Sequence, residues 1–422
     1  MEILVNRYAA LLAAAVALLA APVHAKEGDT FRPFVSTAYF YDDNLFRLDK
    51  NEAPGLKRAD RYGLLSAGVD VDWKPGRQQV LVNASKTLVR YDRYDYLDYD
   101  GDDLKAVWNW RLGNRFSGNL GASTSTSQSN FADIGLVNNQ VDRERRFGRA
   151  EWEFHPRWRI GVGFETTDNT NSDPSLFSQD FNQDSYDILV TYRTPKGSTV
   201  RGRVRRTDSD FPTMKLLGLN PFPPLAAVAD SSYEQTDYTL LADWRFSAKL
   251  VLRGEAGWVD RKYTNALKGS YAPYEPWMAS YEVLPVDRPD YSGFNGRLTA
   301  DWYPTAKTLL SLSGYQELGG ATDINASSVL KRGASVTGVW LIREKWRMNG
   351  EASYENRDFR GDMEAGTTQT EDDTVGASLS LNYTPIRAVS MDLGVRTGRR
   401  DSNIAAGDYT FNSVFFSVRG DF

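Results

Sequence analysis

Apolar and polar residues alternate along most of this chain with a period of two, the pattern of a β-strand with one apolar face. In the carboxy-terminal stretch 408–422, Val414, Phe416 and Val418 share a face with the final Phe422. A strand needs about 9–11 residues to cross a bilayer, and this stretch is long enough. It predicts either a membrane-spanning strand or the amphipathic edge strand of a soluble β-protein.

The same alternation recurs upstream. In 62–73, Leu65, Val69 and Trp73 oppose Ser66 and Asp70. Similar stretches are 157–168, 233–246, 345–357, 371–384 and 387–400. The first and third strands, predicted at 31–42 and 79–91, alternate less cleanly.

Turn signals divide the chain into hairpins. Eight short turns rich in Pro, Gly and Asn alternate with nine longer connections, near 43–61, 92–100, 128–143, 169–183, 209–233, 263–290, 318–327, 358–371 and 401–407. This asymmetry is typical of outer-membrane barrels, which have short periplasmic turns and long external loops. We therefore predict an all-β, transmembrane, antiparallel up-and-down β-barrel of about 18 strands. The repeat of roughly 44 residues could indicate propeller blades, but each unit is only a hairpin.

An aromatic residue ends the strand before each short turn. Amphipathic rings at one depth form the girdle of a membrane barrel. The predicted periplasmic girdle comprises Trp73, Trp110, Phe154, Tyr192, Trp244, Trp302, Trp340 and Tyr383. The alternative, rings that cap a soluble core, accounts for one or two of these positions.

The amino terminus predicts secretion. Residues 1–25 hold an apolar run and an A-x-A-like site, Val23-His24-Ala25, so we expect a signal peptide cut before Lys26 and a single barrel domain over 26–422. Glu2 offsets Arg7, which leaves a retained helical anchor as an alternative.

The amino-acid composition limits the classes of protein to which the chain can belong. Aromatic residues make up 13% of the chain, cysteine is absent and the mean hydropathy is −0.49. No later stretch approaches the roughly 20 apolar residues of a membrane helix. The net charge of −5 gives no basic excess, so nucleic acid is not expected as a partner.

Catalytic chemistry has few candidates. Of two histidines, His24 leaves with the signal peptide and His155 falls in a predicted periplasmic turn. A Ser-His site or a histidine metal site in the interior is thereby excluded. Paired carboxylates remain possible, but no spacing singles out a pair. We predict no enzyme activity, no metal and no cofactor.

The predicted lumen face carries charges of both signs, on Arg149, Glu151, Arg201, Arg203, Arg205, Arg253, Glu255, Arg297 and Asp301. They indicate either a polar track for a hydrated, anionic polymer or simple cross-strand pairing. Arg201, Arg203 and Arg205 form a ladder on one strand and are the best candidates for the track.

Three loops carry further signals. Tyr91, Tyr94, Tyr96 and Tyr99 stand among aspartates at the outer end of one hairpin and are candidates for sugar contact. The alternative is an external aromatic girdle. The apolar, Pro-rich loops 211–229 and 263–289 could fold inward as a constriction, offer a docking surface, or pack on themselves outside.

The stretch Phe34–Arg47, with Asp60–Gly63 and Val71–Trp110, resembles the EpsL-type outer-membrane barrels of exopolysaccharide loci, including the exosortase-associated type. Its most specific part is Tyr-Asp-Asp-Asn-Leu-Phe-Arg at 41–47. The resemblance implies a role in polysaccharide synthesis or export, with polysaccharide and periplasmic export machinery as partners. The final strand and Phe422 resemble the insertion signal of barrels that the barrel-assembly machinery places in outer-membrane lipid. A general diffusion porin and a barrel enzyme acting on polysaccharide or lipid are the alternative functions.

Overall fold

The computed structural model describes residues 30–221, 224–264, 282–285, 287–319, 328–360, 370–404 and 407–422. The predicted signal peptide, 1–25, lies outside them. Within these ranges, no helix is both long and apolar enough to span a membrane.

One antiparallel sheet of 18 strands closes on itself. Each strand pairs with the next one of the sheet along the chain, and the last, β21 (Tyr409–Asp421), pairs with β1 (Phe31–Asp42). The intervening strands are β2 (Asp60–Trp73), β3 (Gln79–Tyr91), β4 (Tyr99–Leu112), β5 (Phe116–Gln128), β6 (Gln140–His155), β7 (Trp158–Asn171), β8 (Phe181–Arg193), β9 (Thr199–Asp210), β12 (Tyr233–Arg245), β13 (Leu250–Tyr263), β15 (Tyr291–Thr305), β16 (Thr308–Leu318), β17 (Ser328–Arg343), β18 (Trp346–Arg360), β19 (Glu371–Ile386) and β20 (Val389–Ser402). Closure leaves this 18-stranded sheet without an unpaired edge strand, as a lipid environment requires. The predicted fold and strand number are confirmed.

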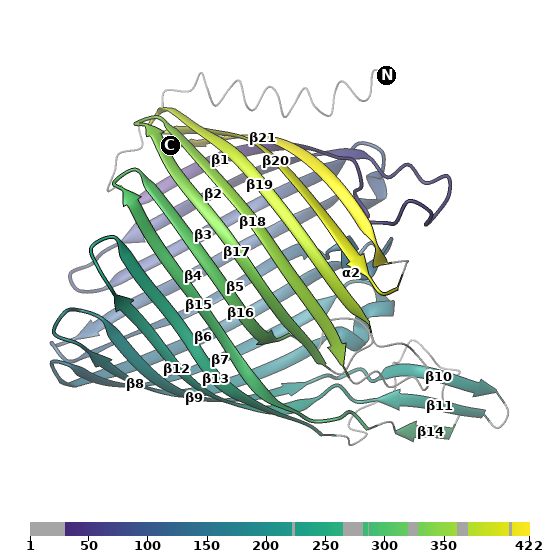
Figure 1. Ribbon diagram of the computed structural model, residues 1–422, viewed down its shortest axis with the longest axis horizontal. Helices are drawn as coiled ribbons and strands as arrows, with labels where there is room; N and C mark the ends of the chain where they lie inside the picture. The colour runs from purple at the N-terminus through teal and green to yellow at the C-terminus, as the bar shows by residue number, and fades with distance from the viewer. Residues whose placement is uncertain are drawn as a thin grey trace.

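The connections differ in length between the two ends of the barrel. Eight short turns join β2 to β3, β4 to β5, β6 to β7, β8 to β9, β12 to β13, β15 to β16, β17 to β18 and β19 to β20. Gly76 and Gly113 adopt positive φ in two of them, a conformation that glycine takes without strain. The longer connections meet at the opposite end, and both ends of the barrel domain lie on the short-turn side (Figure 1).

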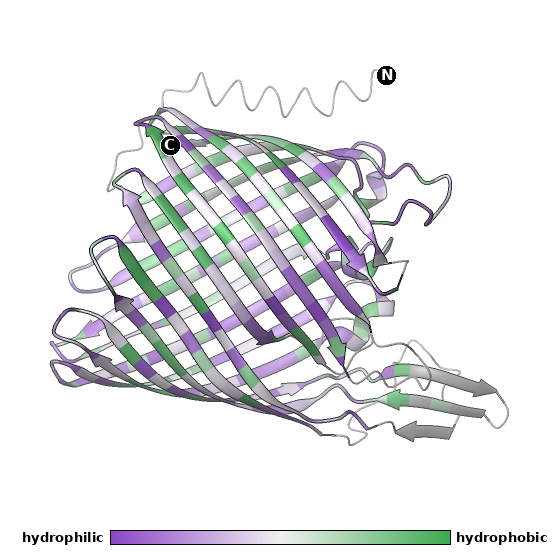
Figure 2. Cartoon of the chain, in the orientation of Figure 1, coloured by the Kyte–Doolittle hydropathy of each residue, from purple (hydrophilic) through white to green (hydrophobic). Residues whose placement is uncertain are grey.

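The two faces of the sheet differ in polarity. Hydrophilic and hydrophobic residues alternate along the strands in Figure 2. Leu240, Trp244 and Leu298 are exposed on the outer face by 56%, 46% and 59%. Such exposure is normal for a surface that meets lipid and abnormal for one that meets water.

Three short strands form a second sheet. β10 (Lys215–Pro221) pairs antiparallel with β11 (Pro224–Ala229), which pairs parallel with β14 (Glu282–Pro285). The sheet extends beyond the long-loop end of the barrel (Figure 1). Strands β10 and β11 of loop 211–229 therefore pair with β14 of loop 263–289 outside the barrel, and these three strands build no inward constriction.

Candidate functional site: the barrel lumen

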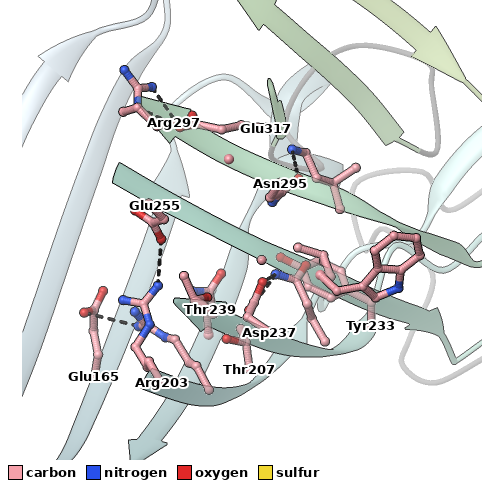
Figure 3. Close-up of a pocket in the computed structure, with 18 residues that line it drawn as sticks. Glu165, Arg203, Thr207, Tyr233, Asp237, Thr239, Glu255, Asn295, Arg297 and Glu317 are labelled. Atoms are coloured by element: carbon pink, nitrogen blue, oxygen red, sulfur yellow. Dashed lines mark hydrogen bonds and ion pairs between the residues drawn. The ribbon is translucent and has the colours of Figure 1, made fainter. Parts of the chain in front are cut away.

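A polar cavity of about 370 Å³ lies inside the barrel, along the wall built by β7 to β16 (Figure 3). Alternate residues of each strand face it, because successive side chains of a strand point to opposite sides. On β9, Arg203 and Arg205 face the cavity, whereas Val204 is 47% exposed on the outer face. The other polar lining residues are Glu165, Gln183, Thr207, Gln235, Asp237, Thr239, Glu255, Asn295, Arg297 and Glu317.

Every rung of the predicted arginine ladder has a carboxylate partner. Nitrogen-to-oxygen distances are 2.6 Å from Arg201 to Asp243, 3.1 Å from Arg203 to Glu255 and 3.3 Å from Arg205 to Glu165. Figure 3 shows Glu255 and Glu165 approaching the ladder from either side. The ladder is therefore neutralised along its length.

The remaining predicted lumen residues are paired in the same way. Arg149 lies 2.6 Å from Asp187, Glu151 lies 3.9 Å from Arg159, and Arg297 lies 2.8 Å from Glu317. Arg253 contacts Asp301. Cross-strand pairing, one of the two interpretations of these charges, thus accounts for the contacts of all nine residues.

Aromatic side chains form the upper edge of this wall. Phe181, Tyr233 and Tyr263 are buried in one cluster at the long-loop ends of their strands, together with Phe211, which directly follows β9. The guanidinium of Arg261 stacks on Tyr233, 4.1 Å from the ring centre, and donates through Nε to Gln235. We did not predict this cluster from the sequence.

Three long connections form an apolar core at the opposite side of the mouth. Phe46 and Leu97 are fully buried there, together with Phe131 and Tyr91. Phe46 and Phe131 meet edge to face with ring centres 5.1 Å apart. We call this the loop core. Its members come from loop 43–59, the end of β3, the short helix η1 (Asp95–Leu97) and the helix α2 (Phe131–Ile134).

The loop that carries α2, residues 129–139, reaches strands distant from it in the sequence. The Asp133 carboxylate lies 3.1 Å from Arg357 on β18 and 3.5 Å from Arg400 on β20. Arg400 also donates to the Ala132 carbonyl at 2.8 Å. Both guanidinium groups are buried and share a second carboxylate, Asp372 on β19. We call loop 129–139 the strap.

The stretch 41–47 joins the closing strands to the loop core. Asp42 accepts two hydrogen bonds of 2.8 Å from Arg47, whose guanidinium stacks 3.7 Å from the Phe411 ring of β21. Asn44 donates to the Thr410 carbonyl at 2.9 Å. This network fixes the loop at the β1–β21 seam and directs Phe46 inward.

The four predicted sugar-contact tyrosines have different surroundings. Tyr91 is buried in the loop core, so its ring is not free to stack on a sugar, and that prediction does not fit its position. Tyr99 is half-buried and packs on the same core. Tyr96 is 53% exposed, and Tyr94 lies against it. Burial raises the pKa of Tyr94 and Tyr96 above the ordinary tyrosine value, so both hydroxyls stay protonated at neutral pH.

The aromatic residues that end strands lie on the outer face beside the short turns. Trp73, Phe154, Trp244, Trp302 and Trp340 are exposed by 45 to 54%. Trp110, Tyr192 and Tyr383 are half-buried on the same face. Tyr192 of β8 packs against Trp158, and Tyr383 of β19 packs against Trp346. These two tryptophans begin the preceding strands, β7 and β18, and we did not predict them as girdle members. Phe422 packs beside Val389 and Val418.

Among the described residues, no group of three or more His, Cys, Asp or Glu is arranged to hold a metal ion. His155 ends β6 at a short turn, where its Nδ1 accepts a hydrogen bond from the Arg157 amide. The histidine is therefore remote from the lumen cavity.

Comparison with known proteins supports the architecture. Residues 288–422 match the family described as "Putative beta-barrel porin 2". The fold is similar to that of the outer-membrane protein OpdK of Pseudomonas aeruginosa, solved with vanillate, at 10% sequence identity and a TM-score of 0.50, covering 93% of this chain and 99% of that one. OccK2 (OpdF) of the same organism, in complex with glucuronate, gives the same identity and TM-score over 93% and 98% of the two chains. No curated protein sequence matches this chain. The molecule therefore has the closed, 18-stranded antiparallel barrel architecture of outer-membrane porins.

Proposed function

We propose that this protein is a passive outer-membrane channel for small hydrophilic solutes. One observation carries the proposal: a cavity of about 370 Å³ with a polar, charge-bearing wall lies inside a barrel whose outer face is apolar. Barrels of 16 to 18 strands leave room for an aqueous path unless loops fill it. The porin family match over 288–422 supports the same function. The bacterial outer membrane, reached after signal-peptide cleavage, is the corresponding location.

The loop core and the strap favour small solutes over polymers. Both occupy the mouth on the side of β1–β5 and β18–β20, where buried side chains hold them in place. A hydrated chain would have to displace these contacts, whereas a small solute needs only the cavity wall on the other side.

Liposome swelling tests the proposal. Liposomes containing the purified protein should admit arabinose and glucose, and the rate should fall steeply for disaccharides and larger sugars. Liposomes that carry the protein and swell no faster than empty ones in any of these sugars would contradict it.

A second candidate function is a part in exopolysaccharide biosynthesis or export, as the resemblance at 34–47 implies. The exposed ring of Tyr96, which follows Asp95 on the long-loop side, favours it, because such rings stack on sugar faces. Partners would then include the polysaccharide and periplasmic export machinery, in addition to outer-membrane lipid and the barrel-assembly machinery. Deleting the gene should abolish extracellular polymer while precursor synthesis continues. Normal polymer secretion by the mutant would contradict this role.

Both proposals assign the protein no catalytic step and no cofactor. Purified protein incubated with polysaccharide should leave the polymer's chain length unchanged, and shortening of the polymer would indicate an enzyme instead.

A further inference from the structure

Resting on the proposed channel function, we propose that the lumen cavity is a binding site for uncharged, hydroxyl-rich solutes of monosaccharide size and disfavours anions. The volume of about 370 Å³ lies within the range of small-molecule sites. The arginine ladder alone would indicate a path for anions. The carboxylates paired with it indicate that the cavity does not favour anions.

Carboxylates balance the guanidinium groups in the cavity wall. Arg203, Arg205 and Arg297 line it, and so do Glu165, Asp237, Glu255 and Glu317. Arg145 adds a second cation to Glu165, at 2.8 Å. With it, four guanidinium groups face four carboxylates.

Close pairing weakens the field that an entering anion would feel. The nitrogen-to-oxygen distance in each ion pair is 2.8 to 3.3 Å. The positive and negative charges of a pair are therefore at nearly equal distances from a solute, and their fields largely cancel. An anion drawn to Arg203 also approaches Glu255 and is repelled by it. Asp237 strengthens the repulsion, because within the described part of the chain its carboxylate accepts from the amide of Gln235, at 3.0 and 3.1 Å, and forms no ion pair with a guanidinium.

Hydroxyl groups suit this wall because they both donate and accept. A guanidinium has five N–H donors and a carboxylate about four acceptor sites, so a pair joined by one contact keeps several of each. Gln183, Asn295 and Thr239 add neutral donors and acceptors. A polyol can use these groups without breaking an ion pair or leaving a charge unpaired.

Glucose and gluconate serve as the probes, since each carries five hydroxyl groups on six carbons and gluconate alone carries a negative charge. Liposomes with the full-length mature protein should swell faster in glucose than in gluconate. In planar bilayers under a KCl gradient, chloride should have no severalfold advantage over potassium.

Two opposite charge changes sharpen the test. The double variant Glu165→Gln/Glu255→Gln frees Arg203 and Arg205, so chloride preference should rise severalfold and gluconate entry should approach or overtake glucose entry. Arg203→Gln/Arg205→Gln should shift the preference toward potassium. Glu144→Gln is the control, because Glu144 pairs with Arg146 on the outer face of β6 and its loss should leave selectivity unchanged.

The outcomes separate this inference from the channel proposal. A conducting channel in which the unmodified protein admits gluconate faster than glucose, or in which both double variants leave the ion preference unchanged, would overturn the inference alone. A protein that neither conducts nor swells liposomes would overturn the channel and this site with it.

Discussion

At the scale of single residues, Arg47 connects the barrel seam to the loop core. Its guanidinium makes two hydrogen bonds to Asp42, which is nearly fully buried, and stacks on Phe411. Arginine suits this position because its planar fork fits a carboxylate and a ring face at once, which an ammonium group cannot do. The neighbouring residue, Phe46, is buried in the loop core.

Arg47→Lys should therefore destabilise the folded barrel, by about 2 kcal/mol if one charge-assisted hydrogen bond and the stacking are lost. The measurement is the midpoint of urea unfolding in detergent or lipid, followed by heat-modifiable gel mobility. Arg58→Lys in the same loop is the control, because the Arg58 guanidinium makes a weak hydrogen bond of 3.5 Å to the Glu52 carbonyl, and the Arg58 backbone is unchanged by the substitution. Equal midpoints for the two variants would show that the Arg47 network contributes nothing to the seam.

At the scale of elements, the strap is held by charge. α2 has a single turn, too short to be stable alone. Phe131 anchors one side of it in the loop core, and Asp133 anchors the other on Arg357 and Arg400. Without Asp133, the two buried guanidinium groups of Arg357 and Arg400 would lose one of the two carboxylates that they share, which costs free energy.

Asp133→Asn should loosen the strap while the barrel stays folded. Amide hydrogen exchange across 131–135 should accelerate by at least about tenfold, equivalent to ~1.4 kcal/mol of local stability. Asp95→Asn, in the first turn of η1, is the control and should leave that exchange unchanged. Unaltered protection of 131–135 in the Asp133 variant would mean that apolar packing alone holds the strap.

At the scale of the whole molecule, the barrel could be predicted because its signals are local. Period-two alternation predicts each strand, and an aromatic residue before a short turn indicates the short-turn end of the barrel. The positions of Trp73 and Trp244 could therefore be predicted from the residues next to them in the sequence. The mouth could not be predicted in this way. Asp133 and Arg357 are 224 residues apart, and nothing in either segment indicates the other. One signal in the sequence could have indicated the loop core. Phe46, Leu97 and Phe131 are apolar residues in polar loops, where they cannot contribute to the lipid-facing surface of a strand.

The difference in length between the short turns and the long loops predicts which end of the barrel faces the periplasm. Because the chain has no cysteine, single introduced cysteines can test this orientation directly. Glu52→Cys, in a long loop, should react with a membrane-impermeant maleimide added to intact cells. Lys196→Cys, in the short turn between β8 and β9, should react only after the outer membrane is permeabilised. Labelling of Lys196→Cys but not Glu52→Cys in intact cells would reverse the orientation.

The most direct test of a water-filled path through the barrel is single-channel recording of the full-length mature protein in planar lipid bilayers. We expect steady, discrete conductance steps in KCl that persist without added solute, because the polar wall of β7–β16 remains beside the loop core. A bilayer that stays electrically silent after verified insertion of folded protein would contradict it.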